Sequence, residues 1–575
     1  MKRNLSKKII SAFCVMLLLC LTLLSGCGKT QTVQIGHGTP GEVAGIDWSG
    51  FDKLIAQIKS ETDFEKRAYL MHLAEDMVMD TGAVIPLYYS MTVYLQNPEI
   101  SGIYIASNGI TDFANIRKSD GSKSIKIHAC VEPATLDPSL NSTQDTGVVA
   151  TNTMAGLYRC GENDEMIPAL AKSCEISDDK CVYSIELKDN LKWSDGSPLT
   201  ADDFVYSWKR AAQTLTGAQY GYMFNVIKGY PDNLEVYSRN DGKTLEVHLT
   251  APCPFFKDLC AFSAFYPVKQ SQVEKANGYK NAEGVVVNPG AWANEAGVIS
   301  CGAYTVESWK HNESMILKKN PYYYDADKVS ADCVELMLTS DENTAYNAFL
   351  SGNIDFTNHV PHEQLTIASQ TPAFHKKNIN GATMVMFNVK APVFAGMTAE
   401  EAKTFRKAMS YVIDRQFIID AVVMSGNQPA NSIMPPQIKD GNGGLFKKNS
   451  SAYTYPYEGG YYDTAVQLDK ARDMLRSIGF EFDENGKITT DLTVEYKLNS
   501  TIDNENIAAC LQADLDQLGI NLSVNSLEWN VFIKETRNGI FESKRYAWNT
   551  DYNDALAMLE IFTSDSSNND AQLGK

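Results

Sequence analysis

The second half of the sequence alternates amphipathic helices with short β-strands, and this pattern limits the possible folds more than any other feature. Apolar spacing predicts a helix over residues 469–478, ended by Gly479, and another over 507–518, ended by Gly519. Strand patterns follow at 493–498 and 521–524. Strands that alternate with helices in this way predict α/β domains with largely parallel sheets.

The length and charge of the chain exclude several classes of protein. At 575 residues it is too long for one hydrophobic core, so we expect two or three domains. Its formal net charge of −19 argues against nucleic acid as a partner, because phosphate binding needs clustered Lys and Arg. The acidic balance favours solubility and, weakly, cationic ligands.

The first 27 residues have the features of a lipoprotein signal peptide. A basic start that includes Lys2 and Arg3 precedes an apolar run, residues 9–24, which is short for a membrane span. The run ends in Leu-Ser-Gly-Cys, which resembles a lipobox, so we expect Cys27 to be diacylated and to anchor the protein to the membrane. An uncleaved anchor or a plain secretory signal would also place the protein outside the cytoplasm.

Residues 28–47 are predicted to form a flexible tether. Residues 36–41 spell G-x-G-x-x-G, but Pro40 falls inside that loop and no βαβ unit surrounds it, which excludes a dinucleotide site. Residues 51–116 are predicted to fold. Apolar residues at helical spacing predict a helix near residues 54–58 and another over 67–79, followed by strands at 83–89 and 93–95.

Nine cysteines follow the signal, and their odd number leaves at least one unpaired. Two pairs have spacings that suit a bridge, Cys174 with Cys181 across a turn and Cys253 with Cys260. Free buried cysteines fit the sequence as well, and no spacing resembles a zinc site. The nine are Cys130, Cys160, Cys174, Cys181, Cys253, Cys260, Cys301, Cys333 and Cys510.

The segment 545–554 near the end of the chain is dense in groups that bind ligands. Asp551 offers a carboxylate, and Trp548 and Tyr552 offer aromatic faces; together these suit an ammonium group. The Arg545 guanidinium suits the carboxylate at the other end of a peptide. On the residues alone, a buried strand carrying one salt bridge fits equally well.

Several motifs, taken in order, resemble those of the extracellular oligopeptide- and dipeptide-binding proteins, the solute-binding protein family 5 of ABC-type importers. They are the Leu-Asp-Pro turn within residues 132–138, Pro-Ala-Leu-Ala at 168–171, and the specific stretch 191–204. Within 191–204, Thr200 is predicted to cap a helix with Asp203 as the partner in a capping box. Segment 545–554 resembles the family's binding strand.

The resemblance implies roles for individual residues. Asp551 would hold the α-ammonium of a ligand, and Arg545 would reach a ligand carboxylate. Trp548 and Tyr552 belong to the same motif. Asn549 stands where some members carry a disulfide cysteine, and we include it among the candidate ligand-binding residues. In the family's Asn-Gly-x-Tyr element, Cys301 stands in place of the usual Asn, which puts a ligand role at this position in doubt.

The fold implied by the resemblance is α/β, of the periplasmic-binding-protein-like type II. It has two lobes and an extra subdomain, hinged around a ligand cleft. We expect the first lobe at 99–165 and 295–378, the extra subdomain at 166–294, and the second lobe at 379–575.

The order of the family's segments is changed in this chain. Family members continue beyond the binding strand with two helices and an Ile-Pro-Leu-Tyr strand. Here the chain ends at Lys575, whereas residues 51–55, 67–75 and 85–89 resemble that tail. We interpret residues 48–98 as a displaced C-terminal piece of the second lobe, which makes the chain circularly permuted. A scrambled gene model or a chance helical insertion is the alternative.

The function implied is that of a lipid-anchored receptor on the outer face of the cell membrane or in the periplasm. It would capture peptides and deliver them, as a monomer without a cofactor or metal, to an ABC permease and its ATPases. A non-peptide ligand (nickel chelate, haem or oligosaccharide) and an adaptor role are rivals. An enzyme such as a surface peptidase is disfavoured, because no Gly-x-Ser-x-Gly occurs and His362-Glu363 lacks the second His of His-Glu-x-x-His.

Overall fold

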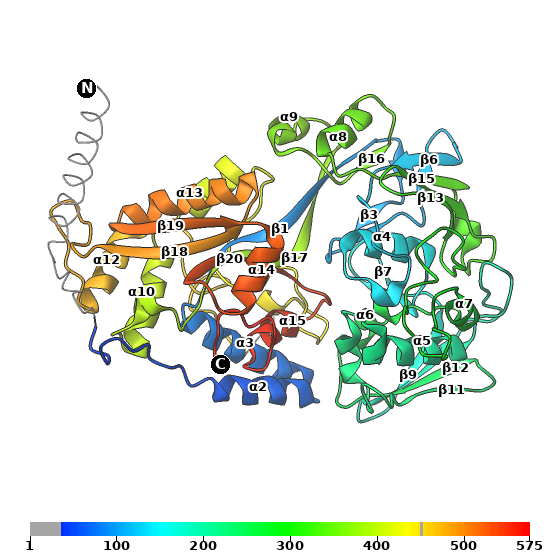
Figure 1. Ribbon diagram of the computed structural model, residues 1–575, viewed down its shortest axis with the longest axis horizontal. Helices are drawn as coiled ribbons and strands as arrows, with labels where there is room; N and C mark the ends of the chain where they lie inside the picture. Colours follow the sequence, from blue (N-terminus) through cyan, green and yellow to red (C-terminus); the bar gives the residue numbers. More distant parts are fainter. Residues whose placement is uncertain (1–35, 449–451) are drawn as a thin grey trace, which may run out of the picture.

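The computed structural model describes residues 36–448 and 452–575 and shows two lobes joined by long strands (Figure 1). We call the part built on a six-stranded sheet the second lobe. The first lobe surrounds a four-stranded sheet, and the extra subdomain surrounds another four-stranded sheet on the same side of the molecule. The predicted signal peptide and Cys27 lie outside the described residues.

The six-stranded sheet carries the two strands that connect the lobes. Strands β1 and β17 pair antiparallel along most of their length and run from the second lobe to β16 in the first (Figure 1). The strand order is β16 (Phe356–Thr357), β1 (Val84–Gln96), β17 (Phe374–Phe387), β20 (Ser543–Asn549), β18 (Leu492–Asn499) and β19 (Ile520–Leu527).

Helices cover both faces of this sheet. Successive strand residues point to opposite faces, and β1 illustrates the consequence: Val84 packs in a core with α2 and α3, whereas Ile85 packs in a core with α10, α12 and α13. The helices of this lobe are α2 (Ser49–Ser60), α3 (Phe64–Asp80), α10 (Ala399–Ser410), α11 (Arg415–Ile418), α12 (Leu468–Ser477), α13 (Ile502–Asp516), α14 (Trp529–Arg537) and α15 (Leu556–Leu559).

The first lobe is built on the strand order β13 (Tyr304–Lys310), β14 (Ser314–Lys319), β15 (Cys333–Met337) and β6 (Ser124–Ile127). Short two-stranded pairings surround it: β2 (Ile100–Ser101) with β5 (Arg117–Lys118), β3 (Tyr104–Ile105) with β4 (Thr111–Asp112), and β7 (Tyr158–Cys160) with β8 (Met166–Pro168). Its helices are α4 (Gln144–Thr153), α8 (Glu342–Leu350) and α9 (Leu365–Ala368).

The extra subdomain has an antiparallel sheet in the order β11 (Val236–Arg239), β12 (Thr244–His248), β10 (Val182–Leu187) and β9 (Ala171–Ile176). Its helices are α5 (Ala201–Ala212), α6 (Phe256–Leu259) and α7 (Gln270–Lys275). The predicted capping box of α5 is confirmed, since the Thr200 backbone N–H donates to Asp203 Oδ2 at 2.9 Å.

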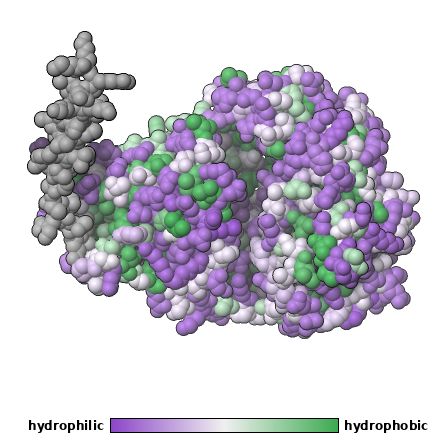
Figure 2. Space-filling view, in the orientation of Figure 1, coloured by the Kyte–Doolittle hydropathy of each residue, from purple (hydrophilic) through white to green (hydrophobic). Residues whose placement is uncertain are grey.

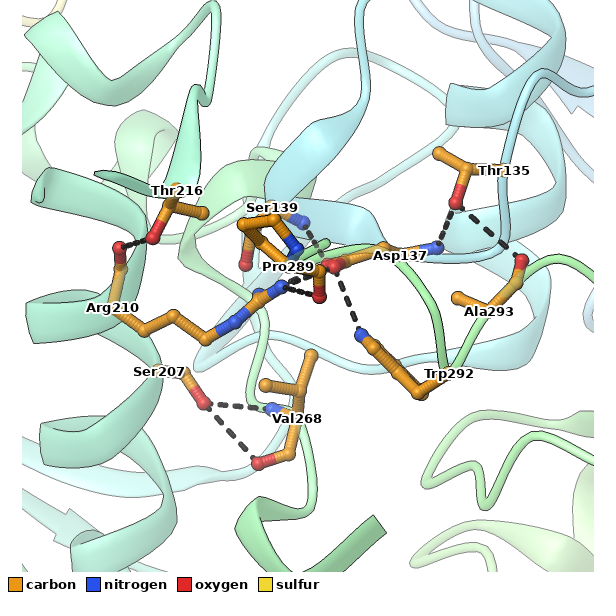
Figure 3. A network of polar contacts seen from close by, with 10 residues as sticks. All are labelled: Thr135, Asp137, Ser139, Ser207, Arg210, Thr216, Val268, Pro289, Trp292 and Ala293. Carbon is orange, nitrogen blue, oxygen red and sulfur yellow. Dashed lines mark hydrogen bonds and ion pairs between the residues drawn. The ribbon is translucent and has the colours of Figure 1, made fainter. Parts of the chain in front are cut away.

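A buried ion pair ties this subdomain to the first lobe (Figure 3). Asp137 of the Leu-Asp-Pro turn accepts hydrogen bonds from both terminal nitrogens of Arg210 on α5 and, at 3.0 Å, from Trp292 Nε1. Arg210 also donates to the carbonyl oxygen of Pro289 at 2.9 Å. The motif therefore has a structural role, at the joint between two sheets.

The prediction of largely parallel sheets is wrong. Among the named strands of the described residues, only the β15–β6, β18–β19 and β18–β20 pairings are parallel. Two of these parallel pairings, β18–β19 and β18–β20, come from the helix–strand alternation after residue 468, because α13 and α14 form crossover connections between the strands. Most other neighbouring strands are joined by hairpins or come from segments far apart in the sequence, and these pair antiparallel.

Helices α2 and α3 pack in one hydrophobic core with the C-terminal segment of the chain. In Figure 1 the blue α2 and α3 lie beside the red C-terminal segment, and the Trp48 indole nitrogen donates to the carbonyl oxygen of Phe562 at 2.8 Å. β1 is an interior strand between β16 and β17. Ile103 lies in one hydrophobic core with Ile125, and the adjoining strand β3 pairs with β4.

The nine cysteines of the described residues are all free, so neither bridge that the spacing allowed is formed. Cys253 and Cys260 are buried, and their burial raises the pKa of both thiols well above the usual value. Among the described helices, none has the length and apolar character needed to cross a membrane.

Candidate functional site

A cavity of about 530 Å³ lies between the lobes, where Figure 2 shows a groove. The second lobe contributes residues of β1, β20 and the loop around Ser425, while the first lobe and the extra subdomain contribute Asn108, Thr143 and Tyr220. Of the described residues in its wall, only Arg545 and Asp551 carry a charge. Such a volume is within the range of small-molecule sites.

The register of β20 decides which side chains of segment 545–554 reach this cavity. Side chains alternate along a strand, and Arg545, Ala547 and Asn549 line the cavity. Trp548 points to the opposite face, where its indole nitrogen donates to the carbonyl oxygen of Ala557 at 3.0 Å. Trp548 has the opposite strand parity to Arg545 and does not line this cavity, so its contact with a ligand stays a prediction.

Tyr552 also lies away from this cavity. Its ring stacks on Phe255 of the extra subdomain, with centroids 4.1 Å apart, and its hydroxyl donates to Glu560 at 2.5 Å. It lines a second interlobe cavity instead. The chain turns after β20 ends at Asn549, so the alternation that holds along the strand does not place Tyr552.

Asp551 lies at the boundary between the lobes. The Tyr222 hydroxyl, from the extra subdomain, donates to Asp551 Oδ2 at 3.1 Å. Burial raises the pKa of Asp551 to about 6, and although the hydrogen bond from Tyr222 opposes this shift, the nearby Glu560 carboxylate adds to it. A carboxylate that is poorly solvated in this way gains strongly from an incoming cation.

Arg545 has a donor that the described part of the protein leaves unused. Its Nε is buried and has no hydrogen-bond partner among the described residues. Buried donors without a partner are rare in folded proteins and need an explanation. A carboxylate ligand in the cavity would provide one, because a guanidinium binds carboxylates through paired hydrogen bonds.

Residues 165–570 match the family model described as "Bacterial extracellular solute-binding proteins, family 5 Middle". This chain is a family 5 solute-binding protein. It is 30% identical over 458 residues to the periplasmic oligopeptide-binding protein OppA of Salmonella typhimurium, covering 76% of this chain and 77% of that one. It is 29% identical over 474 residues to the oligopeptide-binding protein OppA of Bacillus subtilis, covering 79% and 80%.

Solved structures support the same assignment. A periplasmic oligopeptide-binding protein of Borrelia burgdorferi superposes with a TM-score of 0.58 at 26% identity, over 78% of this solute-binding protein and 84% of that chain. The murein tripeptide binding protein MppA of Escherichia coli gives 0.58 at 24% identity, over 79% and 84%, which supports the fold alone. The family is one of binding proteins rather than enzymes.

Much of the wall of this solute-binding protein's cavity was not predicted from the sequence. Asn108, Thr143 and Gln144 come from loops and a helix start in the first lobe, and nothing in their local sequence marks them. Tyr88, Ser90, Met91 and Thr92 of β1 also line the cavity, and because the pairing of β1 with β17 is irregular there, strand alternation alone does not identify them. In the described residues no cluster of three or more His, Cys, Asp or Glu could hold a metal ion.

Proposed function

We propose that this solute-binding protein captures peptides with a free amino end in the interlobe cavity and delivers them to an ABC-type importer. The observation that carries the proposal is the pair of opposite charges in an otherwise uncharged wall, Asp551 and Arg545. A short peptide is a zwitterion that matches both. The oligopeptide-binding proteins named above are relatives that support the choice of ligand.

The spacing of the two charges fits an extended peptide. Arg545 and Asn549 are four residues apart on β20, or about 13 Å at ~3.3 Å per residue, and Asp551 lies beyond Asn549. A peptide of a few residues has a similar length. The polar side chains of Asn108, Thr143 and Gln144 line the same cavity and would provide neutral partners for a peptide backbone, directly or through water.

We also propose that the protein is held at the membrane by a lipid anchor, where it meets its ABC permease. Diacylation of Cys27 would hold it at the membrane beside its permease and ATPases, and the protein would act as a monomer. The first lobe at 99–165 and 295–378 with the subdomain at 166–294 would close on the second lobe at 379–575. Changing Cys27→Ser should release the protein from the membrane fraction; retention there would argue against the lipid anchor.

The amino-end assignment is tested by calorimetric titration with short peptides and their N-acetylated forms. Asp551→Ala leaves a ligand ammonium buried without a partner, a loss of roughly 3–5 kcal/mol, or several hundred-fold or more in affinity. Acetylation should weaken binding to the unmodified protein to a similar degree. Asp565→Ala, an exposed aspartate nearby, is the matched control and should bind normally. Equal affinity for free and acetylated peptides would contradict the assignment.

A further inference from the structure

Residues 36–42, which we call the clasp, are bound to the beginning of α10 in the second lobe. The backbone N–H of Gly38 donates to the carbonyl oxygen of Gly396 at 2.9 Å, and the backbone N–H of Gly396 donates to the carbonyl oxygen of Glu42 at 2.9 Å. Gly396 is buried just before α10. In Figure 1 the dark-blue chain then runs along the second lobe to α2.

The carboxylate of Glu401 provides a second attachment. It completes the capping box of α10 with Thr398, and its Oε2 also accepts a hydrogen bond of 2.9 Å from the backbone N–H of His37. The His37 Nδ1 atom lies 2.5 Å from Glu401 Oε1. Burial opposes the ionisation of this carboxyl group, but the hydrogen bonds from His37 and Thr398 outweigh it and lower the pKa of Glu401 to about 2. One ionised carboxylate therefore joins the clasp to the start of the helix.

Two glycines of the G-x-G-x-x-G motif allow this close approach. A Cβ added to Gly38 would lie 2.6 Å from the backbone carbonyl carbon and oxygen of Met397, which is too close for any side chain. Gly36 has a φ of +97°, and its Cβ would lie 2.7 Å from Glu401 Oε2. By contrast, a Cβ on Gly45 would meet no atom within 4 Å. The motif that the dinucleotide interpretation left unexplained thus has a packing role.

The segment between the clasp and α2 is also attached to the second lobe. Val43 and Ile46 are both half-buried. Val43 packs against the core that contains α10, α12 and α13, whereas Ile46 packs against the core that contains α2 and α3. Trp48, at the start of α2, is buried. The chain from Gly36 onward therefore follows the surface of this lobe.

We propose that the clasp holds the start of α10 beside a lipid membrane, so that the second lobe is the fixed part of the receptor and the first lobe and extra subdomain move relative to the bilayer. The inference rests on the proposed function, which places a lipid anchor at Cys27. Cys27 and Gly36 are nine residues apart, and a chain of that length spans at most about 32 Å. A chain that was free as far as Trp48 would reach roughly 70 Å.

Hydrogen exchange of the intact protein tests the clasp without depending on the anchor. Gly38→Val clashes with the backbone at Met397, so the amides of residues 36–42 and of Gly396 should exchange at least about tenfold faster. Gly45→Val, the same substitution where there is open space, is the matched control and should leave their exchange unchanged. Equal exchange in the two variants would overturn the clasp.

Two further measurements separate release of the clasp from loss of folding. Peptide affinity should be unchanged in Gly38→Val and Gly45→Val, because the clasp lies outside the wall of the interlobe cavity. Glu401→Gln adds no bulk and removes the charge that His37 contacts, so exchange of the His37 amide should rise in this variant too. An unchanged His37 amide in Glu401→Gln would overturn the role of this carboxylate.

Förster transfer to acceptor-labelled lipids tests the placement at the membrane. The acylated full-length protein is reconstituted in vesicles of phosphatidylcholine and phosphatidylglycerol. A fluorescent amino acid replaces either Glu400, exposed at the start of α10, or Ala282, exposed in the extra subdomain. That subdomain lies at the other end of the molecule from α10 (Figure 1). We expect stronger transfer from position 400, and a smaller difference between the two positions in Gly38→Val than in Gly45→Val.

The outcomes distinguish this inference from the proposed function. Equal transfer from positions 400 and 282, or a difference that Gly38→Val leaves unchanged, would overturn the placement while peptide capture stays intact. Protein that does not remain with the vesicles would contradict the lipid anchor at Cys27 and, with it, this inference.

Discussion

Ionisation of the Asp551 carboxyl group lowers the stability of the ligand-free protein but is required for binding a ligand ammonium. Burial raises its pKa to about 6, above its usual value of 3.8, so the folded ligand-free protein favours the protonated form. Its ionised form therefore costs stability above pH 6, and this cost disappears as the pH falls from 6 toward 4. A ligand ammonium requires the ionised form, so binding responds in the other direction.

We predict that peptide affinity is constant above about pH 6.5 and falls up to tenfold per pH unit below 6. Over the same range the ligand-free protein should not lose stability on account of Asp551. Calorimetry between pH 4.5 and 7.5 with a peptide that has no acidic side chain measures the first effect. In Asp551→Asn the residual binding should lose this pH dependence. An affinity that is flat through pH 6 in the unmodified protein would show that no ammonium binds Asp551.

Among the secondary-structure elements, α3 makes the contact that most clearly joins the N-terminal segment to the end of the chain. Arg67 on α3 donates two hydrogen bonds of 2.9 Å to Asp554, and both side chains are buried, at 1% and 0% exposure. The geometry is bidentate, which is the strongest arrangement for this pair. Removing one partner strands a buried charge.

We predict that Arg67→Ala lowers the free energy of unfolding by roughly 3–5 kcal/mol, visible as a clear drop in melting temperature. Arg67→Met combined with Asp554→Leu should recover much of the loss, because no charge is then left unpaired. Lys66→Ala on the same helix is the control: its side chain is exposed where it pairs with Glu61, and losing this pair should leave the melting temperature nearly unchanged. Equal effects of Arg67→Ala and Lys66→Ala would contradict the account of this joint.

The elements also show which features could be predicted from the sequence. The capping box at Thr200 and the strand bounds near 493–498 depend on a few neighbouring residues, and the structure confirms them. Gly479 and Gly519 follow the ends of α12 and α13 in a left-handed conformation, but α13 ends at Asp516 and begins at Ile502, five residues before the predicted start. The orientation of Trp548 depends on which face of β20 meets the cleft, and the partner of Asp551 is a tyrosine 329 residues away. Local patterns contain no information on such contacts.

For the molecule as a whole, the contact between the start of α2 and the C-terminal segment is what the circular permutation hypothesis expects. The Asp52 carboxylate accepts hydrogen bonds from the backbone N–H and the hydroxyl of Ser564. A Cβ added to Gly574 would lie 2.7 Å from the Cβ of Trp48, so the chain end directly abuts the start of α2. The alignments with the OppA relatives leave between a fifth and a quarter of each chain unmatched.

We predict that moving residues 48–117 to follow Lys575 gives a soluble protein that binds peptides like the original. Deleting the same residues should abolish soluble folding, because it removes β1 from the interior of the six-stranded sheet and strips α2 and α3 from its core. Circular dichroism and peptide titration of the two variants provide the measurement. If the deletion variant folds and binds normally, residues 48–117 are an accessory domain and the permutation is wrong.

Mass spectrometry of the ligand that co-purifies with the intact protein and is released by mild denaturation tests the proposed peptide binding most directly. We expect short peptides with free amino ends, at up to one per protein, and their absence from Asp551→Ala prepared in the same way. A nickel chelate, haem or oligosaccharide at that stoichiometry, or peptides with blocked amino ends, would contradict it.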